Sequence, residues 1–325
     1  MVQTTVVGNY PRIGDTSEEQ KLRRAIARRD RGEIDEAAVR EVEREVVVDV
    51  LREQIRAGVD IVSDGQVGWY DSQSHLARRL AGIEIGGLVR YFDTNTYYRQ
   101  PVVKGPVEWR EPILVDDWRY AQGQSSVPVK AILTGPVTLA SLALDLHYGK
   151  RRALALDFAR ALSMEVRALA NAGATHVQVD EPILTRRPED LALVRETLDR
   201  IAQERGSAEL ILFTYFGDVA KIYRDLLELP ADVIGLDLVQ GERTWSSIAT
   251  CGAAKPLVLG VVDARNTLRE DPRKLAARVR ELRDAVDLDR SYLSPSNGLE
   301  FLPRTRAREK LEILATASRL LGEAA

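Results

Sequence analysis

The stretch His176-Val177-Gln178-Val179-Asp180-Glu181-Pro182 decides how this chain is expected to fold. It begins as a short apolar run with two valines, which is typical of a buried β-strand. Pro182 has no backbone N–H and favours an extended conformation in the residue before it, so the strand must end here. Asp180 and Glu181 are therefore predicted at the C-terminal end of a strand, where α/β folds place their chemistry. The alternative is that both acids begin a solvated loop.

Strand-like and helix-like segments alternate on both sides of this stretch. A helix is predicted between an N-cap at Asp35 and a C-cap at Gly58, because apolar residues recur there at spacings of three and four. The predicted strands are 4–7, 59–62, 128–133, 177–179, 210–215, 232–238, 256–262 and 292–294. The other predicted helices are 151–172, 188–205, 218–228, a short one before 256, 271–286 and 304–321.

Eight strands, mostly followed by helices, predict an α/β fold of the (β/α)8 TIM-barrel type, with the functional loops at the C-terminal ends of the strands. An open, doubly wound sheet is the second interpretation. That fold normally carries a glycine-rich dinucleotide-binding loop after its first strand, and Gly8-Asn9-Tyr10-Pro11 is not such a loop. We therefore expect one barrel over residues 1–325.

Residues 80–125 interrupt this alternation, after the second predicted strand. They are rich in tyrosine and tryptophan, contain scattered prolines and charges, and show little helical periodicity. We interpret them as a β-rich insertion of short antiparallel strands in the form of a hairpin. Insertions of this kind commonly form a lid or a surface for a partner.

The composition is that of an ordinary globular protein. Of its 325 residues, 45% are hydrophobic and 29% charged, and the formal net charge is −3. Acids and bases are interspersed, so we expect no nucleic-acid partner and no membrane anchor. There is no apolar run long enough to span a membrane, we expect no signal peptide, and the single cysteine, Cys251, fits a cytoplasmic protein.

Polar side chains follow the predicted strands and should meet at one end of a barrel. The binding residues predicted from these positions are Asn9, Arg12, Asp64, Thr138, Tyr215, Arg265 and Asn297. Asp180, Glu181 and Asp237 are the predicted catalytic residues. Carboxylates and arginines together suit a small zwitterionic or heteroaromatic ligand. The alternatives are that Asp64 belongs to a turn, that Arg12 is a structural clamp, and that Asp237 pairs with an arginine.

Several of these strand ends resemble the cobalamin-independent methionine synthase family. The resemblance covers nearly the whole chain and rests on stretches in matching order. These are Gly8-Asn9-Tyr10-Pro11-Arg12-Ile13-Gly14, Phe92-Asp93-Thr94-Asn95, Gly135-Pro136-Val137-Thr138, Val177-Gln178-Val179-Asp180-Glu181-Pro182, Thr214-Tyr215-Phe216-Gly217, Gly260-Val261-Val262-Asp263-Ala264-Arg265-Asn266 and Ser294-Pro295-Ser296-Asn297-Gly298-Leu299. The second, fifth and sixth of them are closer to the zinc-free N-terminal barrel of that family.

The resemblance implies a barrel that transfers a methyl group from a methylated folate-like carrier to homocysteine. In the family's catalytic barrel, zinc activates the thiol through a His, two Cys and a Glu. The corresponding positions here hold Phe213, Tyr215, Asp237 and Asn297. Phenylalanine has no donor atom, and neutral tyrosine and asparagine are poor zinc ligands. A zinc site of the family type is therefore not expected.

Three functions follow as hypotheses. The chain is a methyltransferase with homocysteine or a related acceptor, either alone or with a partner chain that supplies a zinc-bearing barrel. Alternatively, it is a diverged, zinc-independent methyl- or alkyl-transfer enzyme with another acceptor. The third alternative is a non-catalytic accessory subunit. Without zinc, the acceptor is activated either by a general base or as a thiolate whose pKa is shifted by neighbouring groups. Asp237 is the candidate base if the acceptor is not a thiol, Asp180 and Glu181 orient the ligand, and Arg12 or Arg265 holds a carboxylate.

Overall fold

The computed structural model describes residues 2–323, and contacts within the chain divide it into two compact units. Unit 1 is built from Met1–Gly68, Tyr120–Val129 and Leu236–Ala325, and unit 2 from Trp69–Arg119 and Lys130–Gly235. The chain passes from one unit to the other within β8 (Val233–Asp237) and within α4 (Val115–Gln124). No helix among the described residues is both long and apolar enough to cross a membrane.

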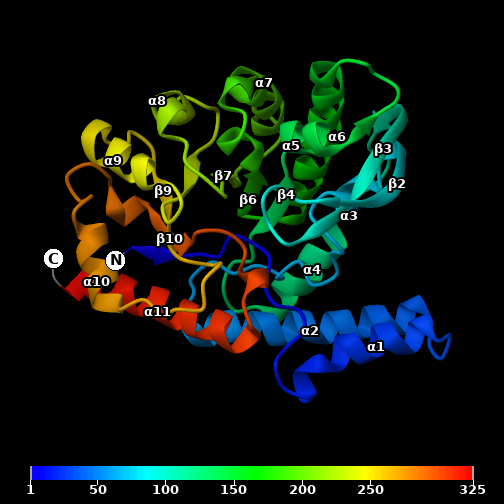
Figure 1. The fold of residues 1–325 in the computed structure, drawn as a ribbon, viewed down its shortest axis with the longest axis horizontal. Coiled ribbons are helices and arrows are strands. Elements are labelled where there is room, and N and C mark those ends of the chain that lie inside the picture. The colour runs from blue at the N-terminus through cyan, green and yellow to red at the C-terminus, as the bar shows by residue number, and fades with distance from the viewer. Residues whose placement is uncertain (1, 324–325) are drawn as a thin grey trace. The chain divides into compact units, whose positions relative to one another are not determined.

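Unit 1 contains parallel strands and the helices that pack against them (Figure 1). Strand β10 pairs in parallel with β1 on one side and β9 on the other, and the end of β8 joins β9 through the hydrogen bond from Leu238 N–H to Gly260 O. The elements that lie wholly in this unit are β1 (Gln3–Thr4), η1 (Glu18–Gln20), α1 (Lys21–Asp30), α2 (Glu36–Ala57), α9 (Glu242–Cys251), β9 (Leu257–Val262), α10 (Pro272–Arg280), η5 (Leu288–Arg290), β10 (Tyr292–Pro295), η6 (Leu299–Phe301) and α11 (Arg304–Glu323).

The two ends of α2 agree with the prediction. The side chain of Asp35 accepts a hydrogen bond from Ala38 N–H, so it caps the first turn. Gly58 adopts a φ of 91°, the left-handed conformation that ends helices and that glycine tolerates best. The buried residues Val39, Val46 and Val50 form the face that packs inward.

The strand predicted at 59–62 is wrong as a full strand. This segment makes only isolated parallel bridges, from Ile61 to Thr5 and from Val62 to Val129. A side chain replaces part of the backbone pairing here. The Asp60 carboxylate accepts hydrogen bonds from both the N–H and the hydroxyl of Thr4. The segment is still parallel to its neighbours, so the expected order of the chain in this unit is preserved.

Unit 2 combines a parallel sheet with an antiparallel ribbon (Figure 1). Strand β6 pairs in parallel with β4 and β7, and the start of β8 lies beside β7, where the Thr214 hydroxyl donates to Gly235 O at 3.3 Å. The elements that lie wholly in this unit are α3 (Ser74–Ala77), β2 (Ala81–Arg90), β3 (Tyr97–Glu108), β4 (Ala131–Thr134), α5 (Pro136–Leu142), β5 (Leu144–Asp145), α6 (Arg151–Ala172), β6 (His176–Asp180), η2 (Pro182–Thr185), η3 (Pro188–Asp190), α7 (Leu191–Ala202), β7 (Glu209–Thr214), η4 (Ala220–Ile222) and α8 (Tyr223–Leu227).

The segment predicted as β-rich is only partly so. Strands β2 and β3 form an antiparallel pair, which β5 extends in parallel, but the end of the segment is the helix α4. The buried carboxylate of Glu165 accepts hydrogen bonds from Ile113 N–H and Leu114 N–H, just before this helix. A carboxylate at this position satisfies backbone donors and favours the N-terminal end of a helix. A lid function for this segment stays a prediction.

Candidate functional site

Asp180 is the last residue of β6, as the sequence predicts, and it is buried. Its Oδ1 accepts a hydrogen bond of 2.7 Å from Gln178 Nε2, and its Oδ2 accepts one of 3.3 Å from the Tyr215 hydroxyl. In the sheet, Asp180 is paired with Thr134 of β4 and with Phe213 of β7. The ends of three neighbouring strands therefore lie side by side at Asp180.

Glu181 directs its carboxylate at the start of α5. Its Oε1 accepts from Val137 N–H at 2.9 Å, and its Oε2 accepts from the N–H and the hydroxyl of Thr138 at 2.8 and 2.6 Å. These are backbone donors that the first turn of a helix leaves without partners. Glu181 and Thr138 are thus brought together as predicted, and in this structure they join β6 to α5. Their predicted roles in catalysis and binding stay predictions.

Burial changes the acidity of both carboxyl groups. It raises the pKa of Asp180 to about 7, against the opposing effects of the Gln178 hydrogen bond, the Lys130 charge and the Tyr215 hydrogen bond. It also raises the pKa of Glu181 to about 7, although three hydrogen bonds from Val137 and Thr138 favour the ionised form. A carboxyl group that still holds its proton near neutral pH can donate it to a ligand.

Lys130 lies close enough to Asp180 for their charges to interact, and it was missed among the predicted site residues. It precedes β4, its side chain is only 2% exposed, and burial lowers its pKa to about 7, against the opposing charges of Asp180 and Glu209. A lysine inside the otherwise apolar stretch 127–133 is the signal that could have identified it. Buried lysines are rare unless a charged partner is near.

The predicted residues near the N-terminus lie on two loops of unit 1 that are bonded together. Tyr10 N–H donates to Gly65 O, and the Ser63 hydroxyl donates to Gly8 O. These bonds bring the loop of Asn9 and Arg12 to the loop of Asp64. The Asp64 carboxylate accepts from Gln66 N–H, which agrees with the alternative that it shapes a turn. The Arg12 guanidinium donates to Val67 O at 3.4 Å, as a clamp between the loops would.

The remaining loops of unit 1 continue the same arrangement. Leu299 N–H donates to Asn9 O, so the loop after β10 lies beside the loop after β1. The Ser296 hydroxyl accepts from Ala264 N–H, so the loops that carry Asn297 and Arg265 are also adjacent. The structure therefore places the predicted residues of this unit on neighbouring strand-end loops.

Two of the positions that the resemblance assigns to zinc, Phe213 and Tyr215, lie in unit 2. The Phe213 ring fills the space above Gly235, where an added Cβ would lie 2.3 Å from Phe213 Cδ2. The Tyr215 hydroxyl is engaged with Asp180. A phenyl ring cannot coordinate a metal, and a tyrosine that retains its proton is a weak ligand.

The zinc positions in unit 1 are also adapted to other contacts. Asp237 Oδ1 accepts from Val239 N–H and Gln240 N–H at 3.0 and 2.9 Å, and Asn297 Oδ1 accepts from the Ser296 hydroxyl. Among residues 2–323, no group of three or more His, Cys, Asp or Glu side chains is arranged to hold a metal ion. The residues present therefore do not fit a zinc ion of the family type.

Comparisons with known proteins agree on one family. The family model described as "Cobalamin-independent synthase, Catalytic domain" matches residues 2–319. A methionine synthase of Saccharolobus solfataricus is 30% identical over 99% of this chain and 96% of its own length. A methionine synthase of Thermococcus kodakarensis is 29% identical over 96% of this chain and 90% of its own length.

Solved structures show the same fold. A B12-independent methionine synthase from Shewanella sp. W3-18-1, in complex with selenomethionine, has a TM-score of 0.85 at 21% identity and covers 100% of this chain and 98% of that one. A protein from Listeria monocytogenes, described as a putative vitamin-B12-independent methionine synthase, has a TM-score of 0.76 at 16% identity. These likenesses confirm the predicted α/β fold class. The match of the family model to residues 2–319 shows that this chain belongs to the cobalamin-independent methionine synthase family.

Proposed function

We propose that this protein transfers a methyl group from a methylated folate-like carrier to homocysteine or a closely related thiol. The match of the family model to residues 2–319 carries the proposal, and curated relatives of nearly the same length are named methionine synthase. Membership in this family implies methyl transfer to homocysteine. The nature of the carrier and the way the acceptor is activated belong to the proposal.

In the proposed reaction, Asp180 is the proton donor. The acceptor sulfur forms a bond to the methyl carbon while the bond from that carbon to the carrier nitrogen breaks. The electron pair of the broken bond stays on the nitrogen, which takes a proton. Asp180 is suited to supply it because burial raises its pKa to about 7, and the Tyr215 hydroxyl and the Gln178 amide hold its two oxygens.

Like Asp180, Asp237 and Glu181 take roles in this proposal that differ from those derived from the sequence, and the other predicted residues keep theirs. Asp237 is the proposed base that takes the acceptor's own proton, and Arg12 or Arg265 is the proposed partner of a substrate carboxylate. Asn9, Asp64, Thr138, Tyr215 and Asn297 are the proposed binding residues. Glu181 supports the reaction by fixing α5 relative to β6 through its three hydrogen bonds.

A second candidate function is transfer to another acceptor. It is favoured by one observation, which is that Phe213, Tyr215 and Asn297 offer no imidazole or thiolate at the positions that the resemblance assigns to zinc. A thiol near neutral pH is mostly protonated and is a poor nucleophile unless a metal or a base removes its proton. An acceptor with a lower pKa, or a partner chain that supplies a zinc-bearing barrel, would remove this difficulty.

Methionine formation from 5-methyltetrahydrofolate and homocysteine, followed by mass spectrometry, tests the proposal. The protein is first dialysed against a chelator and then assayed alone, with zinc, and with a separately purified zinc-bearing methionine synthase barrel. Turnover by the chain alone supports the primary proposal. Turnover only in the mixture supports an accessory subunit. Turnover only when homocysteine is replaced by an acceptor that is not a thiol supports the second candidate. No methylated product in any of these assays contradicts all three.

The role of Asp180 is tested by the same assay. Asp180→Asn keeps the shape of the side chain but cannot donate an acidic proton, so we expect kcat to fall by about 10²-fold or more. The KM for the acceptor should change little. Asp199→Asn, on the exposed face of α7, is the matched control and should retain the wild-type rate. Equal rates for Asp180→Asn and wild type would exclude Asp180 as the donor.

A further inference from the structure

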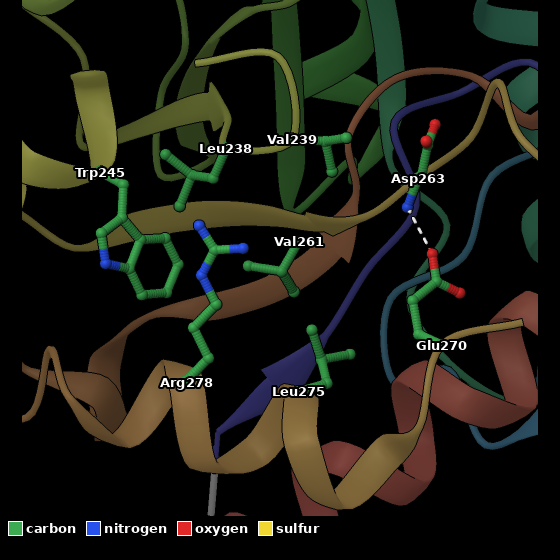
Figure 2. Close-up of a pocket in the computed structure, with 8 residues that line it drawn as sticks. All are labelled: Leu238, Val239, Trp245, Val261, Asp263, Glu270, Leu275 and Arg278. Atoms are coloured by element: carbon green, nitrogen blue, oxygen red, sulfur yellow. Dashed lines mark hydrogen bonds between the residues drawn. The ribbon is translucent and has the colours of Figure 1, made fainter. Parts of the chain in front are cut away.

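A pocket of about 210 Å³ lies in unit 1, and none of the predicted site residues lines it (Figure 2). Leu238 and Val239 follow β8, Val261 is near the end of β9, and Leu275 is on α10. These four side chains give the pocket apolar walls. Sites for drug-sized ligands are usually about 300–1,000 Å³, so this pocket suits a ligand no larger than a single substituted ring.

One end of the pocket is cationic and aromatic. The Arg278 guanidinium lies over the Trp245 ring, 4.5 Å from the ring centroid. Figure 2 shows this pair on one side, with Val261 and Leu275 between it and the acidic residues. Stacking on an indole fixes the plane of a guanidinium and leaves the N–H groups at its edge able to donate. Among residues 2–323, no carboxylate forms an ion pair with Arg278.

The other end of the pocket is acidic, but only one of its two carboxylates is available. Glu270 accepts hydrogen bonds of 2.7 and 2.8 Å from the ammonium of Lys310, which is buried, and a bond of 2.9 Å from Asp263 N–H. Its charge is therefore neutralised by Lys310, which is not among the residues that line the pocket. The Asp263 carboxylate accepts one backbone bond, from Arg265 N–H to Oδ1, and its Oδ2 makes no hydrogen bond within residues 2–323.

From this arrangement we propose that the pocket binds a small aromatic monocarboxylate that carries a hydroxyl or amino group at its far end. The carboxylate pairs with the edge of the Arg278 guanidinium, the geometry in which arginine recognises carboxylates best. The ring packs against Val261 and Leu275, and the hydroxyl or amino group donates to Asp263. This site does not depend on the proposed function, since none of its residues is assigned a role there.

The charge pattern also predicts which molecules the pocket rejects. A second carboxylate at the far end of the ring would face Asp263, and two like charges in a partly enclosed site repel. A ring without any carboxylate would leave the Arg278 guanidinium without its anion. Selection should therefore depend on both ends of the ligand rather than on its apolar body.

Titration calorimetry of the full chain with four probes tests this inference. 4-Hydroxybenzoate should bind with a stoichiometry of one. Benzoate, which lacks the donor, and phenol, which lacks the carboxylate, should bind more weakly. Benzene-1,4-dicarboxylate should bind at least tenfold more weakly than 4-hydroxybenzoate. Absence of saturable binding by 4-hydroxybenzoate, or equal binding of all four probes, would overturn the proposal.

Variants locate the binding. Arg278→Gln should weaken 4-hydroxybenzoate at least tenfold and leave phenol unchanged, whereas Arg273→Gln, an exposed position on the same helix, should have no effect. Asp263→Asn keeps the acceptor for Arg265 N–H and should remove the discrimination against the dicarboxylate. If Arg278→Gln binds 4-hydroxybenzoate as tightly as wild type does, the ligand is not in this pocket and the proposal fails.

Discussion

The carboxylate of Glu181 occupies the space that a side chain on Gly135 would need. A Cβ at Gly135 would lie 2.3 Å from both the Cδ and the Oε1 of Glu181, closer than any real contact allows. Glycine is required at this junction because β4 and α5 approach the end of β6 so closely. The requirement is steric, since the backbone of Gly135 is extended.

Replacement of Gly135 should therefore destabilise the protein. Gly135→Ala displaces the Glu181 carboxylate and weakens its bonds to Val137 and Thr138, and we expect a loss of about 1–3 kcal/mol in the free energy of unfolding. Urea unfolding measures it. Gly123→Ala, in α4, has nothing within 4 Å of the new methyl group and should be neutral or stabilising by about 0.5–1 kcal/mol. Equal effects of the two substitutions would refute the steric argument.

Asp180 should make stability depend on pH. Its pKa is about 7 in the folded protein against an ordinary value of 3.8, so the folded state keeps a proton that the unfolded chain loses. The resulting stability is complete below about pH 4 and is lost as the pH rises to about 7. Over that window it changes on the order of 1 kcal/mol for each pH unit.

Asp180→Asn should flatten this dependence. Asparagine has no titrating proton, so the loss of stability between pH 4 and 7 that comes from Asp180 should disappear, while the part that comes from Glu181 remains. Urea unfolding at several pH values in this window measures the slope for both proteins. An unchanged slope would mean that the Asp180 carboxyl titrates normally in the folded state.

Lys130 should have the opposite effect at higher pH. Its pKa falls from 10.5 to about 7 on folding, so between these values the unfolded chain holds a proton that the folded protein has released. Stability should rise with pH across this window. Lys130→Met should abolish the rise between about pH 7 and 9, whereas Lys104→Met, which removes an exposed lysine paired with Glu84, should retain it. A persistent rise in Lys130→Met would assign it to another group.

Arg304 holds α11 to α2 from inside the protein. Its side chain is 1% exposed, and it pairs with Glu53 at 3.0 Å. Arg304→Met leaves Glu53 with Arg308 as its remaining cation, and we expect a loss of about 3 kcal/mol or more in the free energy of unfolding. Arg31→Met breaks an exposed pair with Glu33 that solvent screens, so it should cost far less stability than Arg304→Met. Similar losses from both would show that burial does not decide the strength of these pairs.

The sequence predicts best those elements whose limits are set by nearby residues. Strand β6 ends at Asp180 because Pro182 follows, and α6 ends at Ala172, where Gly173 adopts a φ of 100°. Both signals lie within a few residues of the boundary they define. The position of Asp180 and Glu181 at a strand end could therefore be predicted, and the structure confirms it.

The elements that were missed depend on distant partners. The backbone just before α4 donates to Glu165, which is about 50 residues further along the chain. The first turn of α5 donates to Glu181, which follows a different strand. No local pattern identifies such caps. For Lys130, the apolar stretch around it is a local signal of burial, but the size of its pKa shift depends on the distant Asp180 and Glu209 and could not be predicted from neighbouring residues.

The cap that Glu181 provides also constrains the order in which unit 2 can fold. Residues 136–142 of α5 leave the ribosome well before Glu181, yet the amides of Val137 and Thr138 obtain their partner only when β6 is in place beside β4. The first turn of α5 is therefore completed by a later part of the chain. Amide hydrogen exchange at these two residues should report the opening of β6 rather than the fraying of their own helix. Two successive strand–helix units thus behave as one cooperative element.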